Sequence, residues 1–283
     1  MAAATIKLFL PHGDAKRLRV AEISNWSGKA VAAPRTEFEE LHRRPESLQS
    51  GVYVLSGTNP ETGMPRTYIG EAEVLRERLK IHKSKDFWVS AMIFVSKDDN
   101  LTKAHVRYLE GRLIAEAERV GRFELENTVG SGAKLPESDR EDMEVFLGRI
   151  QQLLPVLGSD LFVPLTPARE SPDRPALPLV CRVKGAIARG DRTPNGFVVY
   201  KGSTAVLHER PAALRRQPTL VAMRSEMVQS GALVEKDGLL LFTRDVEFSS
   251  PSAAASVIHG GGANGLIEWR TEPSASAQSR PGK

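Results

Sequence analysis

The 283-residue chain has little cysteine and no long apolar run. Its single cysteine, Cys181, excludes an intramolecular disulfide framework and a zinc site built from several cysteines. No apolar stretch approaches the roughly 18 residues that a membrane-spanning helix needs. The first ten residues carry only a short apolar patch interrupted by Lys7, which is not the pattern of a secretory signal peptide. We therefore expect a protein of the reducing cytoplasm without a membrane partner.

Several common ligand-binding patterns are also missing. The sequence contains no internal repeat, no Walker loop, no dinucleotide fingerprint and no His–Cys spacing typical of a metal site. The net charge of +4 favours an anionic partner but is too small to establish one. Basic residues do gather in two stretches, residues 72–85 and 197–224, although solvated helix faces explain such clusters equally well. The candidates for nucleic-acid contact are Lys83, Lys85, Lys201, Arg215 and Arg216.

Composition and patterning divide the chain into six segments. We expect a small N-terminal β annex over residues 1–48, a central domain over 49–132, a connecting helix over 133–160, a Pro-rich linker over 161–178, a C-terminal accessory domain over 179–270 and a disordered tail over 271–283. In the annex, Arg35 precedes a short helix and could touch a phosphate. A capping box that begins at Ser138 is expected to open the connecting helix.

The central segment begins with a β-hairpin. Residues 51–56 and 66–70 are rich in β-branched and aromatic side chains, and the nine residues between them contain Asn, Gly and Pro. The pattern then predicts a helix over residues 73–83, a buried strand over 87–96 and a long helix over 102–119. Glu110 falls on or beside the apolar face of that long helix. A carboxylate there is costly unless it binds a metal or, as the alternative, forms an ion pair with an arginine.

These elements resemble the GIY-YIG nuclease family over residues 51–127. Six residues carry the resemblance in the family's order: the motif tyrosines Tyr53 and Tyr68, the arginine Arg78, the histidine His82 found in some members, the metal-binding Glu110 and the asparagine Asn127. The resemblance implies that these six form a catalytic site, that Glu110 binds Mg²⁺ (or Mn²⁺) and that the substrate is DNA. The chain departs from the family in the 14 residues between the two tyrosines, which is a long spacing, and in Glu71, where one branch often has lysine.

The implied chemistry assigns a role to each group. Glu110 would hold a divalent ion, and Arg78 would donate hydrogen bonds to the non-bridging phosphate oxygens. Tyr53 would act as, or position, the general base. A free phenol has a pKa of about 10, so this role needs a pKa lowered by about 3 units, which we expect from a hydrogen bond to His82 with Arg78 and the metal nearby. Tyr68 would orient the water or the phosphate.

The C-terminal domain has strand and helix patterns, including paired strands over residues 179–188 and 196–200. It resembles a domain of unknown function that often follows GIY-YIG modules, through residues 196–203, residues 248–254 and Asn264-Gly265 with Trp269. None of these is a catalytic group, so the domain could dock DNA or bind a protein partner, including a second copy of the chain.

The sequence therefore predicts an α+β protein: a small, mainly antiparallel three-stranded sheet flanked by helices, followed by a second small α+β domain. The expected function is a metal-dependent DNA endonuclease. A catalytically weak module that binds nucleic acid or protein is the alternative.

Overall fold

The computed structural model describes residues 3–60, 64–127, 130, 132–164 and 178–271. The chain divides into two compact units, Met1–Val163 and Pro164–Lys283, which are called unit 1 and unit 2 below. Both units combine mainly antiparallel sheets with helices, which confirms the expected α+β class and the second α+β domain. Most of the expected linker and the expected tail lie outside the described residues.

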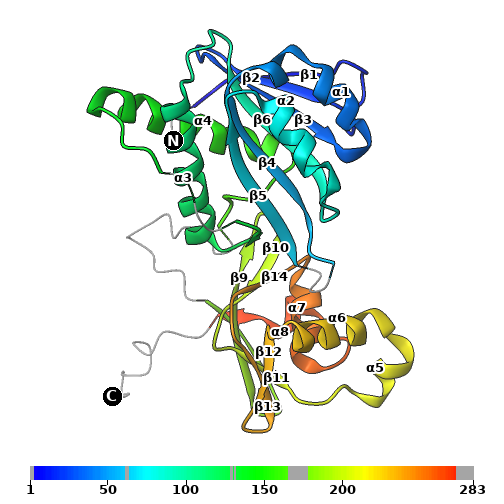
Figure 1. Ribbon diagram of the computed structural model, residues 1–283. Coiled ribbons are helices and arrows are strands. Elements are labelled where there is room, and N and C mark those ends of the chain that lie inside the picture. The colour runs from blue at the N-terminus through cyan, green and yellow to red at the C-terminus, as the bar shows by residue number, and fades with distance from the viewer. Residues whose placement is uncertain (1–2, 61–63, 128–129, 131, 165–177, 272–283) are drawn as a thin grey trace, which may run out of the picture. The chain divides into compact units, whose positions relative to one another are not determined.

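Unit 1 is built on one seven-stranded sheet (Figure 1). Its neighbours pair antiparallel except for β5 and β7, which are parallel. In spatial order the strands are β1 (Ile6–Phe9), β2 (Arg19–Ile23), β3 (Gly28–Pro34), β6 (Trp88–Ser96), β4 (Gly51–Thr58), β5 (Pro65–Ala72) and β7 (Glu124–Leu125).

The sheet is larger than the three strands predicted, because strand β3 joins the N-terminal strands to β6. Its pairing with β6 runs from Gly28 opposite Ser96 to Pro34 opposite Ser90. Alanine and glycine, which have low strand propensity, make up most of β3, so the sequence pattern did not reveal it. Residues 1–48 therefore extend the sheet of the central domain instead of forming a separate annex. As predicted, β6 is a central strand with buried residues on both faces.

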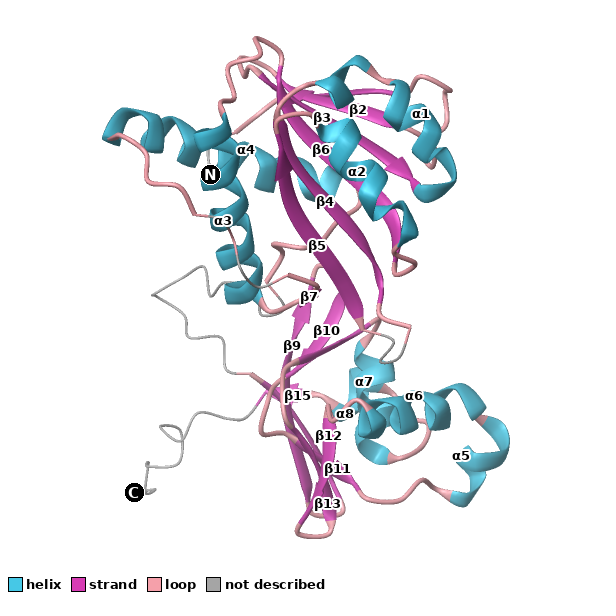
Figure 2. Cartoon of the chain, viewed as in Figure 1, coloured by secondary structure: helices cyan, strands magenta, loops and turns pink. Residues whose placement is uncertain are grey.

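Helices cover both faces of this sheet (Figure 2). The first face packs against α3 (Lys103–Val120) and α4 (Glu137–Val156), and the second packs against α1 (Phe38–Arg43) and α2 (Leu75–Ile81). Alternation along β4 sends Val52 and Val54 to the α3 face and Tyr53 and Leu55 to the α2 face. Three short 3₁₀ turns complete the unit: η1 (Arg35–Glu37), η2 (Pro45–Leu48) and η3 (His82–Ser84).

Helix α4 belongs to the core of unit 1. It buries Phe146, Ile150 and Leu154 against the α3 face of the sheet, so of the two roles expected for it, packing or connecting, the structure shows packing. It also begins at Glu137, before the capping box expected at Ser138, and Pro136 supplies no side-chain cap. In contrast, Thr102 caps α3, because its hydroxyl accepts a hydrogen bond from the His105 backbone N–H.

Within its described residues, 164 and 178–271, unit 2 contains two smaller sheets and four helices. The five-stranded sheet has the order β14-β10-β9-β8-β15, and the three-stranded sheet has the order β11-β13-β12. The strands are β8 (Leu179–Val183), β9 (Ala186–Thr193), β10 (Gly196–Val199), β11 (Thr204–Val206), β12 (Leu233–Lys236), β13 (Leu239–Phe242), β14 (Val246–Phe248) and β15 (Arg270–Thr271). The helices are α5 (Pro211–Arg216), α6 (Pro218–Gln229), α7 (Pro251–His259) and α8 (Gly265–Glu268).

The strand predicted over residues 179–188 is in fact two strands, β8 and β9. Lys184 and Gly185 both adopt positive φ angles, of 45° and 84°, and this turn folds the chain back on itself. Among the helices that the structure describes in both units, none combines the length and apolar character needed to cross a bilayer.

Candidate active site

The centre of the candidate site is a hydrogen bond between two buried side chains of unit 1. The Tyr53 hydroxyl lies 2.8 Å from Nε2 of His82. Tyr53 comes from the middle of β4, and His82 comes from the first position of η3, directly after α2. Gly70 lies opposite Tyr53 on β5, and a Cβ atom there would lie 2.4 Å from the Tyr53 hydroxyl oxygen. The absence of a side chain at residue 70 therefore makes room for the tyrosine.

Tyr68 and Arg78 complete this group on the α2 face. The Tyr68 ring lies 4.4 Å from the His82 ring and 5.9 Å from the Tyr53 ring, measured between centroids. Arg78, on α2, interacts electrostatically with both Tyr53 and Tyr68. Partial burial lowers the pKa of Arg78, but the two tyrosines outweigh it and the pKa is raised overall. Arg78 is thus a fixed positive charge, and its side chain is exposed to a ligand.

The pKa values of Tyr53 and His82 move in opposite directions. Burial and the neighbouring Tyr68 raise the pKa of Tyr53 against the opposing effect of Arg78. Burial, Lys85 and Arg78 lower the pKa of His82 to about 4. The pKa of Tyr53 is raised because, among the protein's own groups, burial penalises the phenolate more than Arg78 favours it. A neutral His82 can instead accept the hydrogen bond from the Tyr53 hydroxyl at Nε2.

A network of backbone contacts holds His82 in place. Nε1 of Trp88 donates to the His82 carbonyl at 2.9 Å. Arg35 stacks over Trp88 with its guanidinium carbon 4.4 Å from the ring centroid, and it donates to the carbonyls of Lys83, Lys85 and Trp88 at 2.9, 2.5 and 3.1 Å. The phosphate contact considered for Arg35 is therefore not how the structure uses it. Arg35 binds the loop that follows His82.

Glu110 approaches from the opposite face of the sheet. It lies on α3, half-buried, and its charge acts on Glu71 of β5. Burial and then Glu110 raise the pKa of Glu71, while Lys103, Arg107 and Arg78 oppose them. Arg78 belongs to the α2 face and Glu110 to the α3 face, and the charges of both act on Glu71 of β5.

That edge of β5 is only partly covered. Strand β7 pairs with Arg66 and Thr67 alone. Asn127 continues the pairing with its side chain: its Oδ1 accepts from the Ile69 N–H at 3.2 Å and its Nδ2 donates to the Ile69 carbonyl at 2.7 Å. Asn127 is therefore placed to fix the segment that carries Tyr68 and Gly70. Beyond Ile69, no strand within the described residues pairs with this edge.

The two lysines predicted to contact nucleic acid in unit 1 are both paired with carboxylates. Nζ of Lys83 lies 2.6 Å from Glu39, and Nζ of Lys85 lies 2.9 Å from Glu126. Lys85 also lies 5.0 Å from the centre of the Tyr68 ring, which places it beside the candidate site.

In unit 2 the basic candidates differ in exposure. Lys201, Arg215 and Arg216 are exposed, and no ion pair joins them to a described residue. Arg224, which closes the predicted basic stretch, is 1% exposed and binds backbone carbonyls. Its positive charge is therefore internal and does not contribute to a docking surface.

Most of the sequence of unit 2 matches one family model. Residues 179–279 match a family model described as a domain of unknown function (DUF4357). This confirms the resemblance expected for the C-terminal region. The DUF4357 match covers unit 2 and stops short of the candidate active site.

No curated protein and no solved structure matches the chain. None of these comparisons supports the GIY-YIG resemblance of residues 51–127, which stays a prediction.

Proposed function

We propose that unit 1 is a divalent-metal-dependent endonuclease of the GIY-YIG type that hydrolyses DNA phosphodiester bonds. The observation that carries this proposal is the convergence of Tyr53, His82, Tyr68 and Arg78 at one place, next to the half-open edge of β5. Each of these residues alone is ordinary in a sheet or helix. Together they supply an exposed cation, Arg78, and a hydroxyl of Tyr53 that is hydrogen-bonded to a proton acceptor, His82.

The contacts support a division of roles for the chain's own residues. Arg78 is exposed and permanently charged, so it can donate to the non-bridging oxygens of a phosphate as negative charge increases there. Tyr53 takes a proton from the attacking water only as its own proton passes to Nε2 of His82, because its phenolate is disfavoured by burial. Tyr68 lies beside this pair and orients the water or the phosphate.

The residues on the α3 face fit a hard divalent cation. Glu110 and Glu71 are two carboxylates close enough for the charge of one to raise the pKa of the other, an arrangement that a divalent ion relieves. We assign Mg²⁺ (or Mn²⁺) to Glu110, with Glu71 beside it. When bound, the ion would supply positive charge to the phosphate and its leaving oxygen.

A second candidate is a weakly catalytic or inactive module that binds nucleic acid or a protein. Two observations favour it: the raised pKa of Tyr53, and a carboxylate at residue 71 close to where a phosphate would lie. The binding module is therefore the second function to be tested, alongside the endonuclease.

A cleavage assay separates these two functions. Full-length protein is incubated with supercoiled plasmid and with branched DNA, with Mg²⁺ or EDTA, and DNA binding is measured in parallel. Glu110→Ala and Arg78→Ala should each lower the cleavage rate by about 10² or more. Glu118→Ala and Arg76→Ala, on the same two helices, are the matched controls and should cut like wild type. Binding without any cutting by the wild type would reject the endonuclease, and cutting by Glu110→Ala would reject the metal assignment.

For unit 2 we propose DNA docking through Arg215 and Arg216, with a protein partner or a second copy of the chain as the other possibility. Both arginines end helix α5 and are exposed. Replacing both with alanine should reduce the salt dependence of DNA binding, because about one counterion is released for each phosphate contact. An unchanged salt slope would favour the partner role, which sedimentation of the free protein can then examine.

A further inference from the structure

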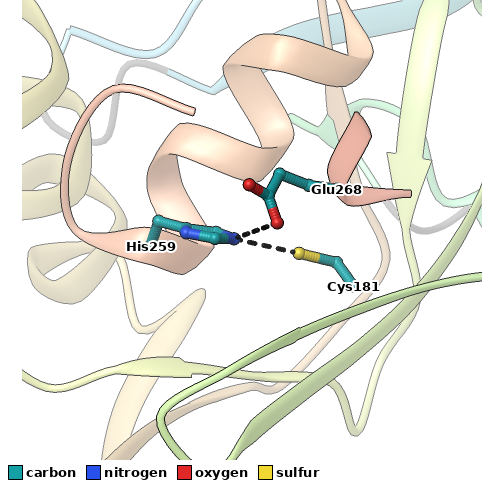
Figure 3. Close-up of side chains that lie close together, drawn as sticks. All are labelled: Cys181, His259 and Glu268. Atoms are coloured by element: carbon teal, nitrogen blue, oxygen red, sulfur yellow. Dashed lines mark hydrogen bonds and ion pairs between the residues drawn. The ribbon is translucent and has the colours of Figure 1, made fainter. Parts of the chain in front are cut away.

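Unit 2 contains a second group of polar and ionisable side chains, none of which the sequence motifs singled out. Sγ of Cys181, Nε2 of His259 and a carboxylate oxygen of Glu268 all lie within 4.8 Å of one another (Figure 3). They come from three separate elements: strand β8, the end of helix α7 and the end of helix α8. Cys181 is fully buried, His259 is almost buried and Glu268 is about one third exposed.

The hydrogen bonds of His259 show which of its two ring nitrogens carries the proton. Nη2 of Arg210 lies 2.9 Å from Nδ1 of His259, and a guanidinium can only donate. Nδ1 therefore accepts, and the proton of the neutral ring is on Nε2. That proton points toward Sγ of Cys181 at 3.4 Å and toward Glu268 at 3.3 Å.

This protonation pattern excludes a Cys–His nucleophile. A histidine that carries its proton on Nε2 cannot remove the proton of the thiol. Burial and the charge of Glu268 also raise the pKa of Cys181 to about 12, and burial lowers the pKa of His259. The three side chains thus have the residue types of a catalytic triad but not its proton arrangement.

The spacing fits a different use. A tetrahedral zinc-type ion, with metal–sulfur bonds of about 2.3 Å and metal–nitrogen or metal–oxygen bonds of about 2.0 Å, holds its ligand atoms about 3.3 to 3.6 Å apart. The Sγ–Nε2 and Nε2–carboxylate distances of 3.4 and 3.3 Å match this. One sulfur, one nitrogen and one oxygen donor are the ligand types that such ions take.

We propose that Cys181, His259 and Glu268 form a binding site for one divalent ion of the zinc type. When the ion binds, the Nε2 proton of His259 moves to Nδ1, and the thiol proton of Cys181 is released to solvent. The ion fixes strand β8 to the ends of α7 and α8. Glu268, about one third exposed, is the ligand through which solvent reaches the site. This site is separate from the Mg²⁺ assigned to Glu110 and does not depend on the proposed nuclease.

Arg210 controls entry of the ion. Coordination at Nε2 requires the proton of His259 to move to Nδ1, where Arg210 now donates. Arg210 is exposed and has a second acceptor, the Gly262 carbonyl at 3.5 Å, so it can turn away from the ring. A glutamine at residue 210 offers a carbonyl oxygen that accepts from Nδ1–H, and Arg210→Gln should therefore bind the ion more tightly.

Cobalt(II) is the probe that tests the site, because a thiolate ligand gives it a charge-transfer absorption in the near ultraviolet. Metal-free full-length protein is titrated with Co²⁺ and then with Zn²⁺, in the absence of Mg²⁺. The expected result is a thiolate band that saturates at one Co²⁺ per chain and disappears when Zn²⁺ is added. The band should be absent in Cys181→Ser and unchanged in Glu110→Ala. Arg210→Gln should bind Co²⁺ about tenfold more tightly.

The wild-type spectrum alone decides the proposal if a variant does not fold. Co²⁺ binding without a thiolate band, or no binding up to millimolar Co²⁺, would overturn the site. Equal affinity of wild type and Arg210→Gln would overturn the role given to Arg210. Zn²⁺ should also raise the melting temperature of the wild type and leave that of Cys181→Ser unchanged.

Discussion

Gly70→Ala is the sharpest test of the candidate site, because a single methyl group reaches its centre. A Cβ at residue 70 would lie 2.4 Å from both the hydroxyl oxygen and the Cζ atom of Tyr53. Tyr53 has no exposed surface and β4 pairs with strands on both sides, so neither the ring nor the backbone can move away freely. The added methyl must displace the ring and break its hydrogen bond to His82.

The cost arises from these two effects. Overpacking a well-packed core costs about 1–3 kcal/mol. Leaving Nε2 of the buried His82 without a partner costs about 1–3 kcal/mol more. For a unit of this size the sum lowers the melting temperature by roughly 5–20 °C.

The assay is thermal and urea unfolding of the full chain, with hydrogen exchange of β4 and β5 to assign the transition to unit 1. Gly148→Ala is the matched control: it lies in helix α4, nothing lies within 4 Å of its added Cβ, and alanine is the better helix former. That variant should be as stable as wild type or more stable. A Gly70→Ala protein that melts with the wild type would refute the placement of Tyr53. Tyr53→Ala should also cost less in the Gly70→Ala background than in wild type.

Three further predictions concern other contacts. The pKa of His82, about 4, lies below its ordinary 6.5, so unfolding takes up a proton between these values. The free energy of unfolding should therefore fall by about 3 kcal/mol as pH drops from 6.5 to 4, and His82→Gln should lose this dependence in urea titrations. Arg35→Ala should raise hydrogen exchange of residues 82–88 at least tenfold, with Arg35→Lys intermediate and the exposed Arg43→Ala unchanged. Arg224→Met removes the ion-pair partner of Glu209 and the donor to the backbone carbonyls of Val206, Leu207 and Val257, and it should destabilise unit 2 by about 3–5 kcal/mol, whereas Arg216→Ala should not.

Local patterns in the sequence predicted much of unit 1. The two strands β4 and β5, the helices α2 and α3 and the central strand β6 occur close to where hydrophobic periodicity and turn residues put them. The contact of Tyr53 with His82 was also expected, and the structure shows it. Such features depend on residues near one another in the sequence, or on the register of one hairpin.

Features that depend on distant residues could not be predicted. Strand β3 is recognised only by its pairing with β6, about 60 residues away, because its small side chains carry no strand pattern. The sequence does not show that Arg35 binds the carbonyls of residues 83, 85 and 88, which lie about 50 residues away. Cys181, His259 and Glu268 are separated by 78 and 9 residues, and no motif spacing joins them. A lone cysteine with a distant histidine is too common a pattern to single out.

The pKa of Tyr53 could not be predicted from the sequence either, and it restricts how the site can work. The sequence supplied the charges that favour a phenolate, but the sign of the shift depends on burial, which only the fold determines. A bound phosphate would add negative charge beside Arg78 and make a free phenolate still less favourable. Catalysis through Tyr53 therefore requires the neutral form of His82 as the proton acceptor.

If unit 1 cuts DNA, the effect of a Tyr53 substitution on the cleavage rate should depend on His82. His82→Gln removes the proton acceptor, and the cleavage rate should then depend little on Tyr53. Cleavage rates of the two single variants and the double variant measure this coupling. Tyr53→Phe should slow the wild type strongly and the His82→Gln enzyme only slightly, because the proton of Tyr53 then has no acceptor to reach. Additive effects of the two substitutions would mean that the proton of Tyr53 does not pass to His82.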